Sequence, residues 1–234
     1  MPACWPPAVS RMAEILLLAA SGLARETLAS IRHTGDHTVV GLLDDNPQLH
    51  GTHIGGVPVL GGLEQARQRT EQLLICAGKG TARAAIAERL GFDAERYATH
   101  VHSSAVLDES VSVGRGSIVL AGCVATCDVT VGEHVVLMPQ VILTHDDVVE
   151  DFATLAAGAT LAGRVTVGRG AYLGTNCTVR EDARIGDGAV LGMGAVLLNE
   201  LPAGQVWAGN PARPLASIPT GTNNSNYIRQ GANP

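Results

Sequence analysis

One histidine of this chain stands beside a carboxylate in a segment that is suited to proton transfer. In Thr144-His145-Asp146, the aspartate can orient the imidazole and stabilise its protonated form, which makes the ring a better base. The next residue, Asp147, puts a second carboxylate where the surrounding pattern calls for a small apolar side chain. Such breaks of a local rule mark functional or strained sites. From these residues alone, a single outward histidine is still more often an ordinary surface residue.

The segment belongs to a run of six-residue units from Val101 to Pro202. Seventeen hexads follow one another without insertion or deletion, and their first position is Val, Ile or Leu except at Ala125. The fifth position is small or apolar except at Ser117 and Asp147. A hydrophobic period of six predicts short strands separated by corners. The pattern resembles the hexapeptide-repeat left-handed β-helix, an all-β prism in which three hexads form one triangular coil. That resemblance implies a trimeric acyltransferase, although the repeat itself is only a scaffold.

The residues before the hexads predict a small α/β domain. Buried strands at 15–20, 39–43, 57–60 and 73–77 alternate with helices at 24–31, 63–69 and 81–90, which indicates a parallel, Rossmann-like sheet. We expect a loose leader over 1–13, this domain over 14–100, the β-helix over 101–215 and a polar tail over 216–234. No segment is long and apolar enough to span a membrane.

The first strand–loop–helix of this domain is a weak nucleotide signal. Ser21-Gly22 opens a helix whose first amides can hold phosphate oxygens, but only one glycine of the G-x-G-x-x-G pattern is present. Asp44 and Asp45 end the next strand, where a carboxylate can bind ribose or base. The domain is too short for a full dinucleotide fold, so a mononucleotide or nucleotide-sugar fits better than NAD. Lys79 and Arg83 either assist with phosphates or are merely solvated.

Net charge and cysteine content indicate which partners and which cellular compartment to expect. A net charge of −6 gives no general attraction to nucleic acid or to an anionic membrane. Five cysteines without paired spacing suit free thiols in a reducing cytoplasm. We therefore expect a cytoplasmic protein.

Six short pieces, taken together, resemble one family over about residues 14–215. The chain is similar to the hexapeptide-repeat nucleotide-sugar acetyltransferases, which include UDP-4-amino-sugar and GDP-perosamine N-acetyltransferases and sialic acid O-acetyltransferases. The matching pieces occur in the family's order and are Ala20-Ser21-Gly22, Leu43-Asp44-Asp45-Asn46, Ile75-Cys76-Ala77-Gly78, Thr144-His145-Asp146, Leu161-Ala162-Gly163-Arg164-Val165 and Ala208-Gly209-Asn210-Pro211-Ala212.

The resemblance implies transfer of an acetyl group from acetyl-CoA to the amine of a nucleotide-linked sugar. His145 would be the general base, Asp146 would orient it, and the Gly163 amide would stabilise the oxyanion. The first domain would bind the sugar nucleotide through Ser21, Gly22, Leu23, Asp44, Asp45 and Gly78. Acetyl-CoA would lie between two subunits of a homotrimer near Thr154, Gly163, Thr175 and Met193, the last two sharing a prism edge with His145. No metal is expected.

Two positions depart from the family pattern. Many members have histidine where this chain has Leu23, which leaves the sugar and the nucleotide open. Many have a second histidine where this chain has Thr154, which indicates different contacts to the thioester or to CoA. Neither departure affects the proposed base.

Four other functions are alternatives for this sequence. A sugar O-acetyltransferase would use the same histidine base. A metal-dependent hydratase would need converging histidines, and residues 101–202 contain no histidine pair of suitable spacing. A ping-pong enzyme would use Cys127, which stacks one coil from His145, as its nucleophile. A non-catalytic trimeric module would bind sugar nucleotides without binding acetyl-CoA.

Overall fold

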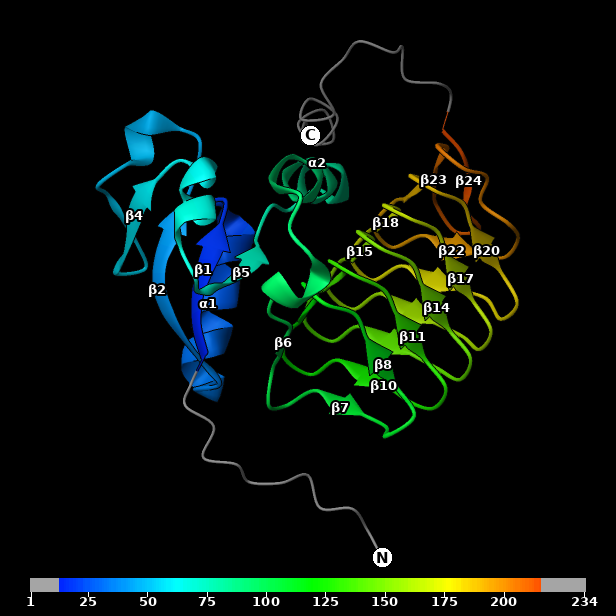
Figure 1. Ribbon diagram of the computed structural model, residues 1–234. Helices are drawn as coiled ribbons and strands as arrows, with labels where there is room; N and C mark the ends of the chain where they lie inside the picture. The colour runs from blue at the N-terminus through cyan, green and yellow to red at the C-terminus, as the bar shows by residue number, and fades with distance from the viewer. Residues whose placement is uncertain (1–12, 216–234) are drawn as a thin grey trace, which may run out of the picture.

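The computed structural model describes residues 13–215, which form an α/β part and a three-sided β-helical prism (Figure 1). The predicted polar tail over 216–234, and all of the predicted leader except Ala13, lie outside the described residues. No helix between residues 13 and 215 has the length and apolar character to cross a bilayer.

The α/β part is built on a five-stranded sheet in the order β3-β4-β2-β1-β5. The strands β1, β2, β4 and β5 run parallel, and β3 joins the edge as the antiparallel half of a hairpin. The bounds are β1 Ala13–Leu18, α1 Gly22–Thr34, β2 His37–Leu43, β3 His53–Ile54, β4 Val57–Gly61, β5 Gln72–Ile75 and α2 Gly80–Leu90, with 3₁₀ helices at Pro47–Leu49, Leu63–Gln68 and Ala94–Arg96. The predicted helix at 63–69 is thus a 3₁₀ helix.

The sequence explains why the sheet forms where it does. The side chains of β1 from Ile15 to Leu18 are fully buried, as expected of a parallel strand that is covered on both faces. The helix α1 begins at the N-cap Ser21 and ends at Gly35, whose φ of 67° is the left-handed conformation that glycine adopts at a helix end. Both ends of α1 are therefore set by local sequence.

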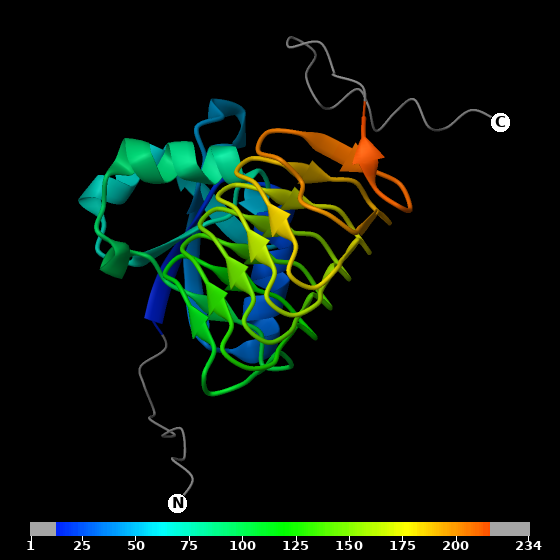
Figure 2. The same cartoon turned by 90° about the vertical axis from the view of Figure 1, so that its right-hand side faces the viewer.

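The prism consists of two-residue strands at the sixth and first positions of successive hexads. Three parallel sheets form its faces, and from β6 to β22 each strand pairs with the strand eighteen residues away (Figure 2). The first sheet holds β6 (His100–Val101), β9 (Ile118–Val119), β12 (Val136–Leu137), β15 (Thr154–Leu155), β18 (Tyr172–Leu173), β21 (Val190–Leu191), β23 (Val206–Ala208) and the antiparallel β24 (Arg213–Pro214).

The second and third sheets complete the triangle. The second holds β7 (Val106–Leu107), β10 (Val124–Ala125), β13 (Ile142–Leu143), β16 (Thr160–Leu161), β19 (Thr178–Val179) and β22 (Val196–Leu197). The third holds β8 (Ser112–Val113), β11 (Thr130–Val131), β14 (Val148–Val149), β17 (Thr166–Val167) and β20 (Arg184–Ile185). Residues at the first and fifth hexad positions form one continuous core along the axis. The predicted fold class, a Rossmann-like α/β domain followed by a left-handed parallel β-helix, is confirmed.

The two parts share a packed junction on the first sheet of the prism. Ile118, Leu120 and Val136 belong to the same hydrophobic core as Ile15 and Leu17 of β1. At Gly80, the first residue of α2, a Cβ atom would lie 2.1 Å from the Phe152 carbonyl oxygen, so only glycine permits this approach. The α/β part is thereby held against one face of the prism.

Arg83 ties α2 to the prism and is not a solvated or phosphate-binding residue. Its guanidinium is fully buried, and it donates to the carbonyl oxygens of His134, Phe152 and Ala153 at 2.8–3.0 Å. It also donates to the Thr154 hydroxyl at 2.9 Å and to carbonyls of the preceding loop. Burial lowers the pKa of Arg83 to about 10, which still leaves the side chain charged at neutral pH.

Candidate active site

His145 lies on the edge of the prism that is opposite the α/β part. The turn from β13 to β14 carries it, and these strands belong to the second and third sheets, whereas the α/β part packs on the first. His145 Nδ1 lies 2.8 Å from Asp146 Oδ2, and both side chains are about half exposed, at 47% and 54%. Because the carboxylate accepts the Nδ1 proton, Nε2 is left unprotonated and can act as a base.

The imidazole lies directly over Gly163 of the next coil. A Cβ atom at Gly163 would stand 2.2 Å from His145 Nε2 and 2.3 Å from Cε1, so the ring occupies the space of the missing side chain. Among residues 13–215, no group accepts a hydrogen bond from the Gly163 N–H. A base nitrogen and an unused amide donor are thus brought together on one edge.

Asp147 lies beneath this turn and is fully buried. One carboxylate oxygen accepts the Thr144 N–H at 2.8 Å, and the other accepts the Val165 N–H at 2.9 Å. Burial raises the pKa of the Asp147 carboxyl to about 6, although the two hydrogen bonds and His145 act in the opposite direction. Asp147, the exception in the hexad pattern, therefore forms two backbone hydrogen bonds directly under the candidate base.

Cys127 stands on the other side of His145, one coil earlier. It is exposed, and its carbonyl oxygen accepts the Asp146 N–H at 3.1 Å. No hydrogen bond joins its thiol to the His145 ring in the described part of the chain. The arrangement therefore gives the thiol no paired base.

The loop from β1 to α1 carries three of the predicted nucleotide-binding residues. The Ser21 hydroxyl donates to the Cys76 carbonyl at 2.5 Å and accepts the Ala24 N–H, so it is committed to fixing the loop. Within the described residues, the amides of Gly22 and Leu23 have no hydrogen-bond acceptor, as at other helix starts. The Leu23 side chain is only 8% exposed and packs in the core. The groups of this loop that are free to bind a nucleotide are therefore backbone amides, and not the side chains of Ser21 or Leu23.

The second nucleotide-binding group lies at the ends of β2 and β5. Asp44 accepts the amides of Ala20 and Asn46, both at 2.8 Å, and so braces the β1–α1 loop. Asp45 forms an ion pair with Arg89 at 2.7 Å, and hydrogen bonding to Arg89 holds the pKa of its carboxyl below the usual value. Gly78 has open space where a side chain would be. The structure brings these loops together at the carboxyl end of the parallel sheet.

The predicted acetyl-CoA residues occupy different parts of the prism. Thr154 is 6% exposed under the α/β part, where its hydroxyl accepts from Arg83. Thr175 and Met193 lie between the first and second sheets, while His145 and Gly163 lie between the second and third. The expectation that Thr175 and Met193 share an edge with His145 was wrong, because 30 residues separate Thr175 from His145 and one coil contains eighteen.

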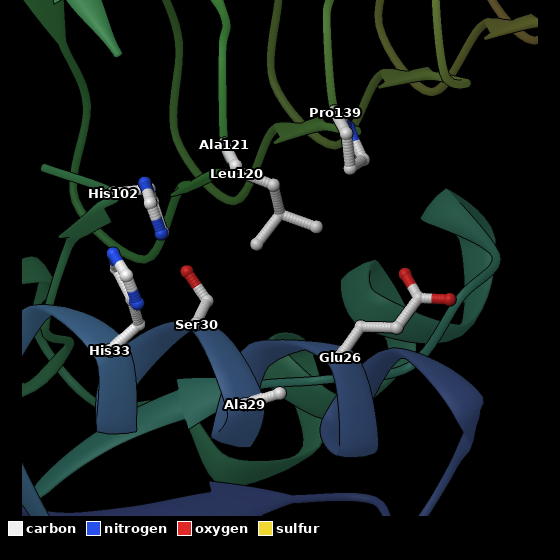
Figure 3. A pocket seen from close by; sticks show the side chains of 8 residues that line it. All are labelled: Glu26, Ala29, Ser30, His33, His102, Leu120, Ala121 and Pro139. Atoms are coloured by element: carbon white, nitrogen blue, oxygen red, sulfur yellow. The ribbon is translucent and has the colours of Figure 1, made fainter. Parts of the chain in front are cut away.

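A single chain therefore does not unite the predicted site. The nucleotide loops lie at the carboxyl end of the α/β sheet, the His145 edge lies between the second and third sheets of the prism, and the Thr175 edge lies between the first and second. A separate open pocket of about 320 Å³ lies between α1 and the first coils (Figure 3). None of the predicted site residues is among those that line it, which are Glu26, Ala29, Ser30, His33, His102, Leu120, Ala121 and Pro139.

Each of the two parts of the chain matches a known protein family model. Residues 14–90 match the family model of the PglD N-terminal domain, and residues 164–199 match that of the bacterial transferase hexapeptide (six repeats). No curated protein sequence gives a significant match.

Two solved structures resemble the whole described chain. The acetyltransferase domain of PglB from Neisseria gonorrhoeae is 26% identical, with a TM-score of 0.79 over 86% of this chain and 99% of that one. Perosamine N-acetyltransferase from Caulobacter crescentus is 25% identical, with a TM-score of 0.80 over 88% of this chain and 98% of that one. WeeI from Acinetobacter baumannii, at 22% identity and a TM-score of 0.61, shares the fold.

The fold is that of the hexapeptide-repeat transferases, with an N-terminal domain of the PglD type before the prism. The resemblance to the nucleotide-sugar acetyltransferases, predicted from six short motifs, is confirmed.

Proposed function

We propose that this protein transfers the acetyl group of acetyl-CoA to the amino group of a nucleotide-linked sugar. The observation that carries the proposal is the His145–Asp146 pair over the unused amide of Gly163. The similar PglB domain has been solved with acetyl-CoA, and the similar perosamine N-acetyltransferase with CoA and GDP-perosamine. These relatives support N-acetylation of a sugar nucleotide, in the biosynthesis of a bacterial surface glycan or glycoprotein.

The reaction needs one base and one oxyanion donor. The sugar nitrogen attacks the thioester carbonyl while His145 Nε2 removes a proton from that nitrogen. Asp146 holds Nδ1–H, which fixes the tautomer and stabilises the imidazolium that forms. The Gly163 N–H would bind the oxyanion of the tetrahedral intermediate. Collapse of this intermediate breaks the C–S bond and returns the proton to the CoA thiolate, giving the amide and free CoA.

The sugar nucleotide would bind at the carboxyl end of the α/β sheet. The free amides of Gly22 and Leu23 at the start of α1 are suited to the diphosphate, and the open space beside Gly78 admits the nucleotide. Asp44 shapes this loop through its bond to the Ala20 amide, while Asp45 can reach ribose or base only by exchanging its Arg89 partner.

The complete site would form between subunits of a homotrimer. In one chain the His145 edge faces away from the nucleotide loops, so a neighbouring copy has to bring the two together. Met193, 72% exposed on the edge shared with Thr175, is a candidate contact for the CoA chain. Light scattering should give three chains per particle at micromolar concentration, and a monomer that retains full activity would contradict the shared site.

We place the protein in the cytoplasm, where acetyl-CoA and sugar nucleotides are available. Its buried free thiols at Cys76, Cys123 and Cys177 fit a reducing compartment.

A substrate panel tests the function. UDP-, GDP- and CMP-linked amino sugars and free sialic acid are each incubated with acetyl-CoA, with thiol release and product mass as readouts. We expect turnover of a nucleotide-linked amino sugar and a mass gain of one acetyl group that resists hydroxylamine, as an amide does. A hydroxylamine-labile product, or turnover of free sialic acid alone, would make the protein an O-acetyltransferase. Binding of a sugar nucleotide without binding of acetyl-CoA would make it a non-catalytic module.

A further inference from the structure

Beneath His145, the regular hydrogen bonding of the prism is interrupted. Neighbouring strands of the three parallel sheets pair through two residues, as Val124–Ala125 does with Ile142–Leu143. Between β13 and β16 only Ile142 and Thr160 pair. Within residues 13–215, every other parallel pair between two prism strands has two residue pairs, and the one further single pairing joins Ile185 to Leu201 at the last coil. The interruption lies between the coil of His145 and the coil of Gly163.

Asp147 accounts for this interruption. In regular coils the amide at the second hexad position donates to a carbonyl of the next coil, as the Thr126 N–H does to the Leu143 oxygen. The Thr144 N–H instead donates to the Asp147 carboxylate, and the Thr144 hydroxyl takes over the Leu161 carbonyl at 3.2 Å. The carboxylate thus replaces a backbone bond between the two coils.

The other carboxylate oxygen replaces a second regular bond. In most coils, the amide at the fifth hexad position donates to the carbonyl oxygen at the second position of the same hexad, as the Ala171 N–H does to the Gly168 oxygen. The Val165 N–H donates to Asp147 instead, across one coil. A buried carboxylate is costly, and it persists only where its hydrogen bonds compensate for lost hydration. The two amides that Asp147 binds lie next to the proposed base and oxyanion donor, since Thr144 precedes His145 and Val165 lies two residues after Gly163.

Ser117 shows what the prism needs from a polar residue at this hexad position. It is the other exception in the pattern, and its hydroxyl accepts the Val135 N–H at 2.8 Å. The bond from the Val165 N–H to Asp147 is equivalent, since each bond joins residues eighteen positions apart. The Ser117 hydroxyl also donates to the Gly132 carbonyl. A single hydroxyl therefore preserves the coil, and the bond to Thr144 is what the carboxylate adds.

We propose that Asp147 is a positioning residue that fixes the His145 turn over Gly163 through its bond to the Thr144 amide. This role rests on the proposed acetyl transfer. Holding the turn from below keeps Nε2 and the Gly163 amide at a fixed separation, which acyl transfer requires at sub-ångström precision. The charged groups around the turn are Asp146, Asp147 and the Arg164–Asp182 ion pair of the next two coils.

Asp147→Ser is the decisive variant, because Ser117 shows that serine maintains this position of the prism. It should keep the bond to the Val165 amide and lose the bond to Thr144. We expect a melting temperature close to that of the wild type, a kcat that is lower by ~10–100-fold, and little change in the KM for acetyl-CoA. Ser117→Ala is the matched control, since it removes the equivalent tie far from His145 and should lower stability without lowering kcat.

Two outcomes would overturn the inference. One is wild-type kcat in Asp147→Ser, and the other is a loss of kcat in Ser117→Ala of the same size. Amide hydrogen exchange, measured without substrate, separates this inference from the proposed function. Thr144 should lose protection in Asp147→Ser while Val165 keeps it, because the Thr144 hydroxyl already occupies the Leu161 carbonyl that its amide would otherwise use. This holds even if the protein transfers no acetyl group. Unchanged protection at Thr144 would refute the inference by itself.

Discussion

Gly163→Ala tests the geometry of the candidate site by filling the space under His145. The added Cβ would stand 2.2 Å from Nε2, 2.3 Å from Cε1 and 2.9 Å from Cδ2, whereas ordinary contacts begin near 3.4 Å. The ring must therefore retreat by about 1.2 Å, the difference between 3.4 and 2.2 Å. A shift of about 1 Å in a catalytic group can cost ~10²-fold in rate, which corresponds to ~2.7 kcal/mol of transition-state stabilisation.

The fold should survive this substitution. The three atoms nearest to the added Cβ all belong to the ring of the half-exposed His145, and Gly163 does not have a positive φ. We expect a nearly unchanged melting temperature and a kcat lower by ~10²-fold, measured by thiol release at saturating acetyl-CoA. Glu181→Ala, at the same hexad position one coil beyond Gly163, is the matched control and should be fully active. Wild-type kcat in a folded Gly163→Ala protein would refute the assignment of this edge.

Three further perturbations have defined outcomes. Cys127→Ala should retain most of its activity, and a labelled acetyl-enzyme at this cysteine would instead establish a ping-pong mechanism. Arg83→Met should lower the free energy of unfolding by ~3 kcal/mol or more in urea titrations, because it leaves buried carbonyls without donors; a change below ~1 kcal/mol would contradict the junction described above. Because burial raises the pKa of Asp147 to about 6 from 3.8, the wild type should lose up to ~3 kcal/mol as the pH rises from about 4 to about 6. In this window the folded state binds the proton more tightly than the unfolded state. Asp147→Asn should abolish that loss, and an unchanged slope would contradict the buried position of the carboxylate.

The prism was predictable because each hexad repeats the same pattern of apolar and polar positions. Inward apolar residues at the first and fifth positions placed every coil, and the two exceptions, Ser117 and Asp147, proved to be buried polar ties. The segment Thr144-His145-Asp146 could also be singled out, since its adjacent imidazole and carboxylate are evident without coordinates. What Asp147 binds was not predictable, because its partners include an amide eighteen residues away.

The relations between the two parts were harder to predict. The interpretation of Arg83 as solvated or phosphate-binding failed, because a charged residue on a short helix gives no sign that it will be buried against carbonyls of another domain. Thr154 is covered for the same reason. His134, at a corner of the prism, is likewise only 3% exposed and stacks on Phe152 at 5.1 Å, since the α/β part closes over that corner. A hexad pattern specifies inside and outside for an isolated prism, and not for a face that receives another domain.

The nucleotide loop shows a similar limit. Ser21 and Asp44 were predicted to bind the nucleotide, but in the structure their side chains brace the β1–α1 loop through the Cys76 carbonyl and the Ala20 amide. The burial of Leu23 shows that an apolar residue at this position completes the core of the α/β part.

The most direct test of the central claim is the kcat/KM of His145→Asn on the amino-sugar nucleotide that the wild type acetylates. We expect a loss of ~10²–10⁴-fold, as for removal of a general base, with acetyl-CoA affinity within a few-fold of wild type by calorimetry. The trimer and the melting temperature should be unchanged, because the side chain is half exposed and its hydrogen bond is to the exposed Asp146 carboxylate. A folded, trimeric His145→Asn protein with kcat/KM within tenfold of wild type would contradict the assignment of His145 as the base.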